Sequence, residues 1–194
     1  MSRNRVPAVL LLGGVVLVVV AAAAWWLTRG QGPELNEIDL VEMFPEAEKR
    51  TNVPSLELAF NIENVTIDGQ RKRCIYATPS SRIIYEVVVP PRGVLDTAFA
   101  VRPDAWDKKG NGVQFRIGVA SDNRYDELLR QHVDPIGREI DRVWHTVVLD
   151  LSAYEGRKVK VIFNTDPGVP GVPGDADTEN DFSVWGEPRI YSHR

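Results

Sequence analysis

The sequence predicts an all-β fold, an antiparallel β-sandwich, preceded by a single N-terminal transmembrane helix. Residues 6–27 form an apolar run without a charge, and from residue 55 onward short segments rich in Val, Ile, Phe and Tyr alternate with turn signals. Many short strands with few helical segments are typical of a sandwich. Only residues 123–131, NRYDELLRQ, look helical, and they fit an excursion between two strands.

The apolar run at 6–27 is long enough to cross a membrane. Its twenty-two residues reach about 33 Å as a helix, enough for a hydrocarbon core of about 30 Å. Trp25 and Trp26 at its end suit the membrane interface. The alternative is a cleaved signal peptide, with small residues at 21–24, but the run exceeds the roughly 7–15 residues of a signal core. We therefore expect a retained anchor.

Basic residues near the span predict its orientation. Arg3 and Arg5 precede it, whereas Arg29 is followed by an acidic stretch. Because basic residues favour the cytoplasmic side, we expect the N-terminus in the cytoplasm and residues 31–194 outside it. This outer portion holds 20 of the 23 Lys and Arg and all 27 Asp and Glu, so its formal charge is 20 minus 27, or minus 7. An acidic surface without a basic stripe makes nucleic acid an unsuitable partner.

Composition divides the chain into three parts. Residues 1–29 form the cytoplasmic tip and anchor, and residues 30–54, which open with GQGPE, read as a juxtamembrane stalk with a short helical turn before Pro45. Residues 55–194 form the sandwich, which the single cysteine, Cys74, cannot brace with an internal disulfide.

The expected strands follow one another from residue 56 to residue 190. Gly, Pro and Asn-rich turns separate them, including a DG pair at 68 and KKGNG at 108–112. The segments are 56–62, 63–67, 73–77, 82–89, 94–101, 112–120, 145–151, 158–165 and 182–190.

The second half of this pattern resembles a known family. The order of GVQFRIGV, WHTVVLDLSAYEGRKVKVIFNTDPG and DFSVWGEPRI is similar to that of the galactose-binding-like jelly rolls, which include carbohydrate-binding modules. The resemblance covers roughly residues 85–190. It implies a jelly-roll sandwich and a non-catalytic role in binding glycan, although one fold hosts many functions.

Two tryptophans are candidates for stacking on a sugar. Trp185, in the last expected strand, more often fills a core or a sheet edge than binds a ligand, and Pro188 after it suits an edge or a bulge. Trp106 lies in a polar loop beside Asp104, Asp107 and Lys108. An aromatic face with charged neighbours is the chemistry of a lectin site, so these four residues are the predicted ligand site. The alternative is an indole folded back over the end of the sandwich.

An acidic loop is a candidate for a structural calcium. Asp175, Asp177, Glu179 and Asp181 are spaced by two residues, which can bring several oxygens to one hard cation. We name Asp175, Asp177 and Asp181 as the possible ligands. The alternative is that these carboxylates are simply solvated, because they lack the full EF-hand pattern.

No catalytic motif is evident in the sequence. There is no G-x-S-x-G nucleophile elbow, and His132 and His145 are not spaced as zinc ligands. A carboxylate pair for glycoside hydrolysis depends on geometry that the sequence does not reveal. We therefore expect a membrane-anchored, extracytoplasmic, non-catalytic module that binds glycan or envelope polysaccharide. The alternative is an interaction subunit that docks another envelope protein.

Overall fold

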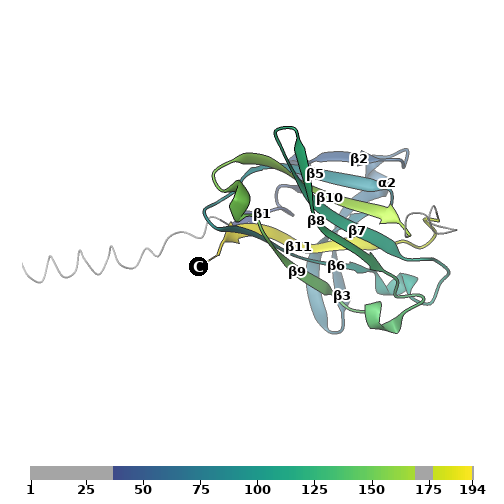
Figure 1. The fold of residues 1–194 in the computed structure, drawn as a ribbon. Helices are drawn as coiled ribbons and strands as arrows, with labels where there is room; N and C mark the ends of the chain where they lie inside the picture. Colours follow the sequence, from purple (N-terminus) through teal and green to yellow (C-terminus); the bar gives the residue numbers. More distant parts are fainter. Residues whose placement is uncertain (1–36, 169–176, 194) are drawn as a thin grey trace, which may run out of the picture. The chain divides into compact units, whose positions relative to one another are not determined.

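The computed structural model describes residues 37–168 and 177–193 (Figure 1). They belong to a compact unit that runs from Asn36 to Arg194. The expected membrane span at 6–27 lies outside these residues. No helix within the described part of the chain is both long and apolar enough to cross a bilayer.

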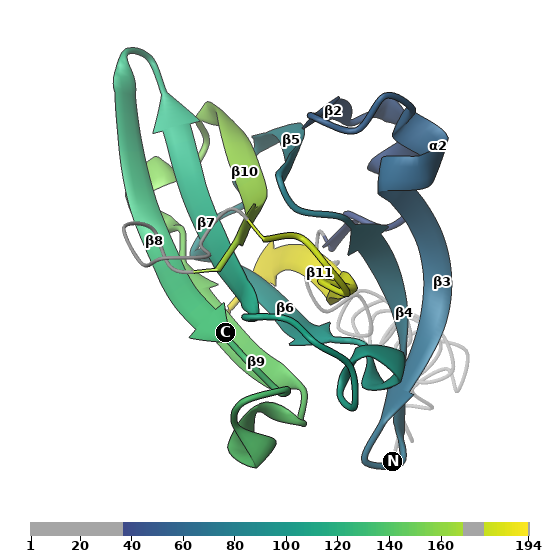
Figure 2. The ribbon, with the colours of Figure 1, turned by 90° about the vertical axis from the view of Figure 1, so that its right-hand side faces the viewer.

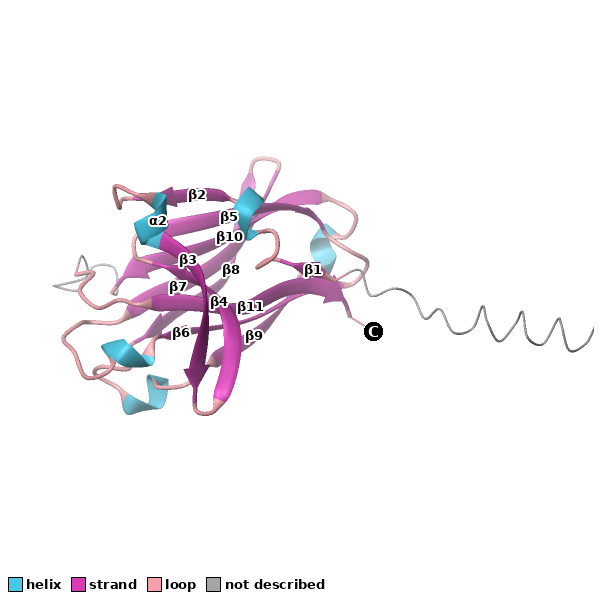
Figure 3. Cartoon of the chain, turned by 180° about the vertical axis from the view of Figure 1, so that it is seen from behind, coloured by secondary structure: helices cyan, strands magenta, loops and turns pink. Residues whose placement is uncertain are grey.

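The described residues form two antiparallel sheets that face each other, with short helical turns confined to the connections (Figures 2 and 3). The first sheet has the order β3 (Phe60–Ile67), β4 (Gln70–Ala77), β11 (Ser183–Ser192), β6 (Gly93–Val101) and β9 (His145–Asp150), and β1 (Ile38–Asp39) also pairs with β11. The second sheet has the order β2 (Glu48–Thr51), β5 (Ser81–Val88), β10 (Lys158–Pro167), β7 (Val113–Ser121) and β8 (Arg124–Val133). The predicted all-β antiparallel sandwich is therefore confirmed.

An aromatic cluster lies at the centre of the core. Trp185 is only 1% exposed, and its ring packs edge-on against Phe115 and Phe163, with centroids 5.0 and 4.9 Å away. Edge-to-face contacts of this kind add to the stabilisation from burial. The interpretation of Trp185 as a core residue is correct. Pro188 follows it in a β-bulge between Gly186 and Arg189, where the missing amide proton is tolerated.

The excursion predicted to be helical at 123–131 is instead strand β8, which pairs with β7 along its whole length. A bulge opposite Ile117 and Gly118 inserts an extra residue into β8. The consecutive residues Leu128 and Leu129 therefore do not alternate between buried and exposed: both are half-buried and pack against the core. This break in period two resembles a helical pattern in the sequence. Pairing with β7 outweighs the local preference.

The first expected strand, 56–62, begins later than predicted. Residues Leu56–Ala59 form one helical turn, α2, and the strand starts at Phe60. The Ser55 side chain caps this turn by accepting a hydrogen bond from the Glu57 amide at 3.2 Å. A serine followed by a glutamate within the first turn is a signal for the start of a helix. A search for alternating apolar and polar residues does not detect this signal.

Residues 37–54, expected as part of a juxtamembrane stalk, contribute strands β1 and β2 to the two sheets. Between them the chain turns at Asp39, whose Oδ1 accepts hydrogen bonds from the amides of Val41 and Glu42 at 2.7 and 3.1 Å. This turn and the 3₁₀-helix η1 (Phe44–Glu46) place Leu40 among the core residues with no exposed surface. The sandwich therefore begins before residue 55.

Candidate functional site

Trp106 is held against the sandwich rather than projecting from it. It follows the 3₁₀-helix η2 (Pro103–Ala105), and its indole N–H donates to the carbonyl of Val101 at 2.9 Å. The Arg142 guanidinium lies 5.7 Å from the ring centroid. The ring packs on a second apolar cluster, on the outer face of the first sheet, whose buried members are Val65, Ile67, Cys74, Ala100 and Val184. These contacts match the alternative of an indole folded back over the sandwich.

The charged neighbours of Trp106 lie on the same loop but contact different groups. Asp104 pairs with Arg102 at 2.7 Å, and Asp107 is exposed, with its carboxylate 3.8 Å from Arg142. The Lys108 ammonium lies 4.7 Å from the centroid of the Phe182 ring. The predicted site residues thus have different partners, and the ligand site at Trp106 stays a prediction.

The acidic loop is described only in part. Asp175 lies outside the described residues, and Asp177 is exposed, with Oδ1 accepting the amide of Glu179 at 2.9 Å. Asp181 is 3% exposed, and burial, with smaller contributions from Asp177 and Asp134, raises its pKa to about 8. Among the described residues, no three carboxylate, histidine or cysteine side chains are grouped as metal ligands. The calcium site stays a prediction.

His145 and Cys74 are packed within the sandwich. His145 stacks on Phe99 with ring centroids 5.6 Å apart, and its Nδ1 lies 3.0 Å from the side-chain amide nitrogen, Nε2, of Gln131. Desolvation lowers its pKa, although Asp141 opposes the shift. Burial raises the pKa of Cys74 to about 12, so its thiolate is not available as a nucleophile near neutral pH.

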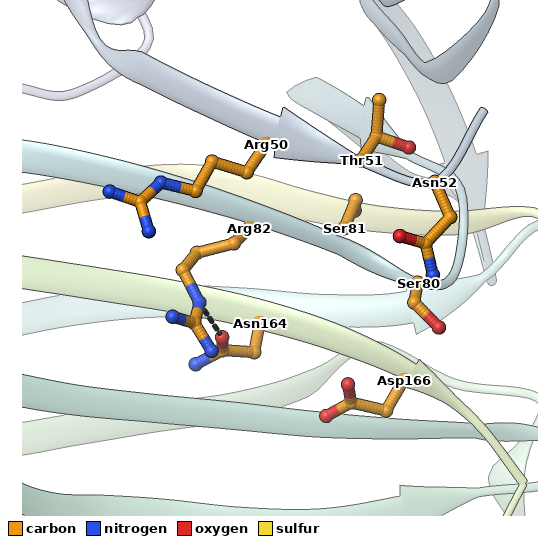
Figure 4. A pocket seen from close by; sticks show the side chains of 8 residues that line it. All are labelled: Arg50, Thr51, Asn52, Ser80, Ser81, Arg82, Asn164 and Asp166. Carbon is orange, nitrogen blue, oxygen red and sulfur yellow. Dashed lines mark hydrogen bonds between the residues drawn. The ribbon is translucent and has the colours of Figure 1, made fainter. Parts of the chain in front are cut away.

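A polar pocket of about 200 Å³ lies where β2, β5 and β10 run side by side (Figure 4). Cross-strand pairing builds it: Arg50 lies opposite Arg82 on β5, and Arg82 lies opposite Asn164 on β10. Because side chains alternate between the faces of a strand, these three share the outer face of the sheet. Guanidinium, amide, hydroxyl and carboxylate groups line the pocket, from Arg50, Thr51, Asn52, Ser80, Ser81, Arg82, Asn164 and Asp166.

Part of this lining is fixed and part is available for a ligand. Ser81 is buried and bonds the Thr165 hydroxyl at 2.6 Å, so its hydroxyl is already occupied. The Asp166 carboxylate accepts Nε and Nη2 of Arg116 at 2.7 and 2.6 Å. Arg82 is exposed, and its Nε donates to Asn164 Oδ1 at 2.7 Å. No described residue accepts a hydrogen bond from its two terminal nitrogens, so these donors remain available to a ligand.

Two other hollows, on the first sheet, are lined by charges that neutralise each other. Lys72 contacts Glu187 at 2.9 Å, and Arg189 contacts Asp96 at 3.0 Å. A ligand would have to displace these pairs. The pocket on β2, β5 and β10 differs in that Arg82, which lines it, forms no ion pair with the described residues.

Sequence reasoning did not find the pocket on β2, β5 and β10. Its residues come from 50–52, 80–82 and 164–166, which only strand pairing brings together. The one signal in the sequence was polar residues at outward positions of otherwise apolar strands, such as Asn164 within KVKVIFNT.

Comparison with known proteins gives the fold. No protein-family profile matches the sequence. An uncharacterised protein from Archaeoglobus fulgidus is 35% identical over 109 residues, which are 56% of this chain and 26% of that protein. The chain thus matches only about a quarter of the length of this relative.

Solved structures of similar fold include CBM51-2 with the INT domains of Clostridium perfringens ZmpB, at 14% identity over 81% of this chain and 32% of that one, with a TM-score of 0.56. CBM51 from Clostridium perfringens GH95 is 12% identical over 80% of this chain and 99% of that module, with a TM-score of 0.55. The sandwich therefore has the jelly-roll fold of carbohydrate-binding modules.

Proposed function

We propose that the sandwich is a non-catalytic carbohydrate-binding module and that a sugar binds in the pocket between β2, β5 and β10. The observation that carries this proposal is the pocket itself, which is lined by guanidinium, amide, hydroxyl and carboxylate groups. Sugar hydroxyls both donate and accept hydrogen bonds. An exposed amide such as Asn52 can match them in both directions, and charged groups strengthen such bonds.

The size of the pocket supports a small ligand. Drug-sized ligands occupy pockets of roughly 300–1,000 Å³, so about 200 Å³ accommodates a compact group such as a single sugar residue. Among the residues that the structure describes, no aromatic side chain lines the pocket. Recognition would therefore depend on hydrogen bonds and charge, and affinity would be modest unless neighbouring sugars contact the sheet around it.

Structures of similar fold support the ligand class. One is the CBM51-2 domain of ZmpB in complex with GlcNAc, with a TM-score of 0.53, and another is CBM51 from GH95 in complex with methyl-galactose. Those proteins are 16% and 12% identical to this chain, so they support the class of ligand and not its identity.

We further propose that residues 6–27 anchor the module in a membrane and display it outside the cytoplasm. The support is the length of the apolar run and the basic residues before it. The full-length chain should remain with membranes after carbonate extraction, and protease added to right-side-out vesicles should digest the sandwich. If peptide mapping showed that the mature chain lacks residues 6–27, the proposed anchor would be contradicted.

Binding can be tested with the full-length chain in detergent on an array of neutral and charged polysaccharides. We expect binding that Asn164→Ala weakens and that Trp106→Ala retains. Arg124→Gln is a control on the same sheet, because Arg124 contacts Asp126 and does not line the pocket. Absence of binding across the array, together with a stoichiometric partner recovered from solubilised membranes, would favour the docking role instead.

A further inference from the structure

Four arginines lie in one row across the outer face of the second sheet. Arg50 is opposite Arg82, Arg82 is opposite Asn164, Asn164 is opposite Arg116, and Arg116 is opposite Arg130. Every strand of the sheet contributes one residue to this arginine row, in the order β2, β5, β10, β7 and β8. With strands about 4.8 Å apart, the row is about 19 Å long.

Three of the four arginines have carboxylate partners. Arg50 contacts Glu48 at 2.5 Å, Arg116 contacts Asp166 at 2.6 Å, and Arg130 makes two hydrogen bonds to Glu127, at 2.7 and 2.9 Å. Arg82 instead faces the neutral amide of Asn164, and no carboxylate of the described residues forms an ion pair with it. Four guanidinium groups and three carboxylates leave one positive charge in excess, and that charge lines the pocket.

We propose that the pocket selects an anionic sugar and that Arg82 binds its acidic group. This inference rests on the proposed function and specifies its ligand class: a sugar residue that carries a carboxylate, sulfate or phosphate. The guanidinium presents its donors in a planar fork that matches two oxygens of such a group. Asn164 holds Nε of Arg82, which leaves the two Nη groups directed to the ligand.

The surrounding charges limit the ligand to one acidic group at the site. Asp166 lines the same pocket, but Arg116 neutralises it through two hydrogen bonds. The outer portion of the chain carries a formal charge of 20 minus 27, or minus 7, so a dense polyanion would be repelled. A glycan with acidic residues spaced along an otherwise neutral chain fits both facts.

The test measures affinities of the full-length chain in detergent for four matched oligosaccharides: a uronate, its neutral parent sugar, and the sulfated and phosphorylated forms of that parent. We expect at least one anionic form to bind about tenfold or more tighter than the neutral parent, because hydrogen bonds to a charged group are about twice as strong as neutral ones. Arg82→Gln should abolish this preference, and Arg82→Lys should retain part of it. Which anion binds best identifies the acidic group.

Arg130→Gln is the matched control, because Arg130 belongs to the same row but lies outside the pocket and is paired with Glu127. It should leave the preference unchanged. Equal affinity for neutral and anionic forms, with loss of both in Asn164→Ala, would overturn the anion proposal and keep carbohydrate binding. Absence of binding to all four oligosaccharides and to the array would overturn both. A preference that Arg82→Gln and Arg130→Gln reduce equally would assign the effect to the general field of the sheet.

Discussion

Arg82 and Asn164 face each other across neighbouring strands, and Arg82 Nε donates to Asn164 Oδ1 at 2.7 Å. The amide orients the guanidinium without neutralising it. Elsewhere in the arginine row the partner is a carboxylate: Arg116 binds Asp166, which lies on β10 two residues beyond the position opposite Arg116. Replacing the Asn164 amide by a carboxylate would therefore change the charge of the pocket while keeping its shape.

Asn164→Asp should eliminate the preference for an anionic sugar. The new carboxylate would pair with Arg82 and lie in the pocket, so an acidic ligand would meet repulsion instead of an uncompensated cation. We expect the affinity for the anionic oligosaccharide to fall to that of its neutral parent in calorimetric titrations. Asn164 is 3% exposed, so the new carboxylate depends on Arg82 to offset its lost hydration, and the melting temperature measured in parallel shows whether the variant is folded. Undiminished anion binding in this variant would contradict the role of Arg82.

Salt should weaken binding of the anionic sugar selectively. Exposed charges are screened over about 10 Å at 0.1 M salt and about 3 Å at 1 M, so the Arg82 contact should weaken as salt increases. The affinity for the neutral parent should stay constant in the same titration series. An anion affinity that does not respond to salt would argue against a charge contact at the exposed Arg82 side chain.

Trp185→Ala should destabilise the sandwich severely. Its ring is almost fully buried and contacts three phenylalanine rings, Phe99, Phe115 and Phe163. Removal of a buried aromatic ring typically costs about 3–5 kcal/mol of unfolding free energy, which urea titration would measure. Val148→Ala is a suitable control, because Val148 is 59% exposed and should shift stability by no more than about 0.5 kcal/mol. A small effect at Trp185 would mean that the two sheets do not pack as described.

Substitutions at Trp106 should separate its structural role from a role in binding. Trp106→Phe loses the hydrogen bond to the Val101 carbonyl, worth about 0.5–1.5 kcal/mol, and Trp106→Ala loses the packing on the second apolar cluster as well. Stability should therefore decrease in the order wild type, Phe, Ala, while sugar affinity of the folded protein is unchanged. If Trp106→Ala keeps its stability and loses binding, the ligand site is the Trp106 loop.

Asp181 should make the protein less stable as the pH rises. Its pKa is about 8 when folded, against an ordinary value of 3.8, so between about pH 4 and pH 8 the folded state holds a proton that the unfolded chain releases. The stabilisation is complete below about pH 4 and is lost as the pH rises to about 8. The melting temperature of Asp181→Asn should fall less between pH 5 and pH 8 than that of the wild type. Identical pH profiles would contradict the raised pKa.

The alternation of apolar and polar residues with a period of two predicted the sandwich, because one face of each strand must be buried. In β10, for example, Val159, Val161 and Phe163 point inward while Lys158 and Lys160 are exposed. The same reasoning failed at β8, where a bulge breaks the alternation, and at α2, where Ser55 caps a helical turn. In both places a contact with another part of the chain or a local cap outweighed the periodicity.

The sequence by itself determined the sheet-forming pattern and the core position of Trp185, because burial of alternating side chains is a local, repeating requirement. It also carries the evidence for the anchor at 6–27. Only the tertiary structure decided which polar residues meet, since Arg50, Arg82 and Asn164 become neighbours through strand register. Register is set by the packing of both sheets at once, and no single segment of the sequence encodes it.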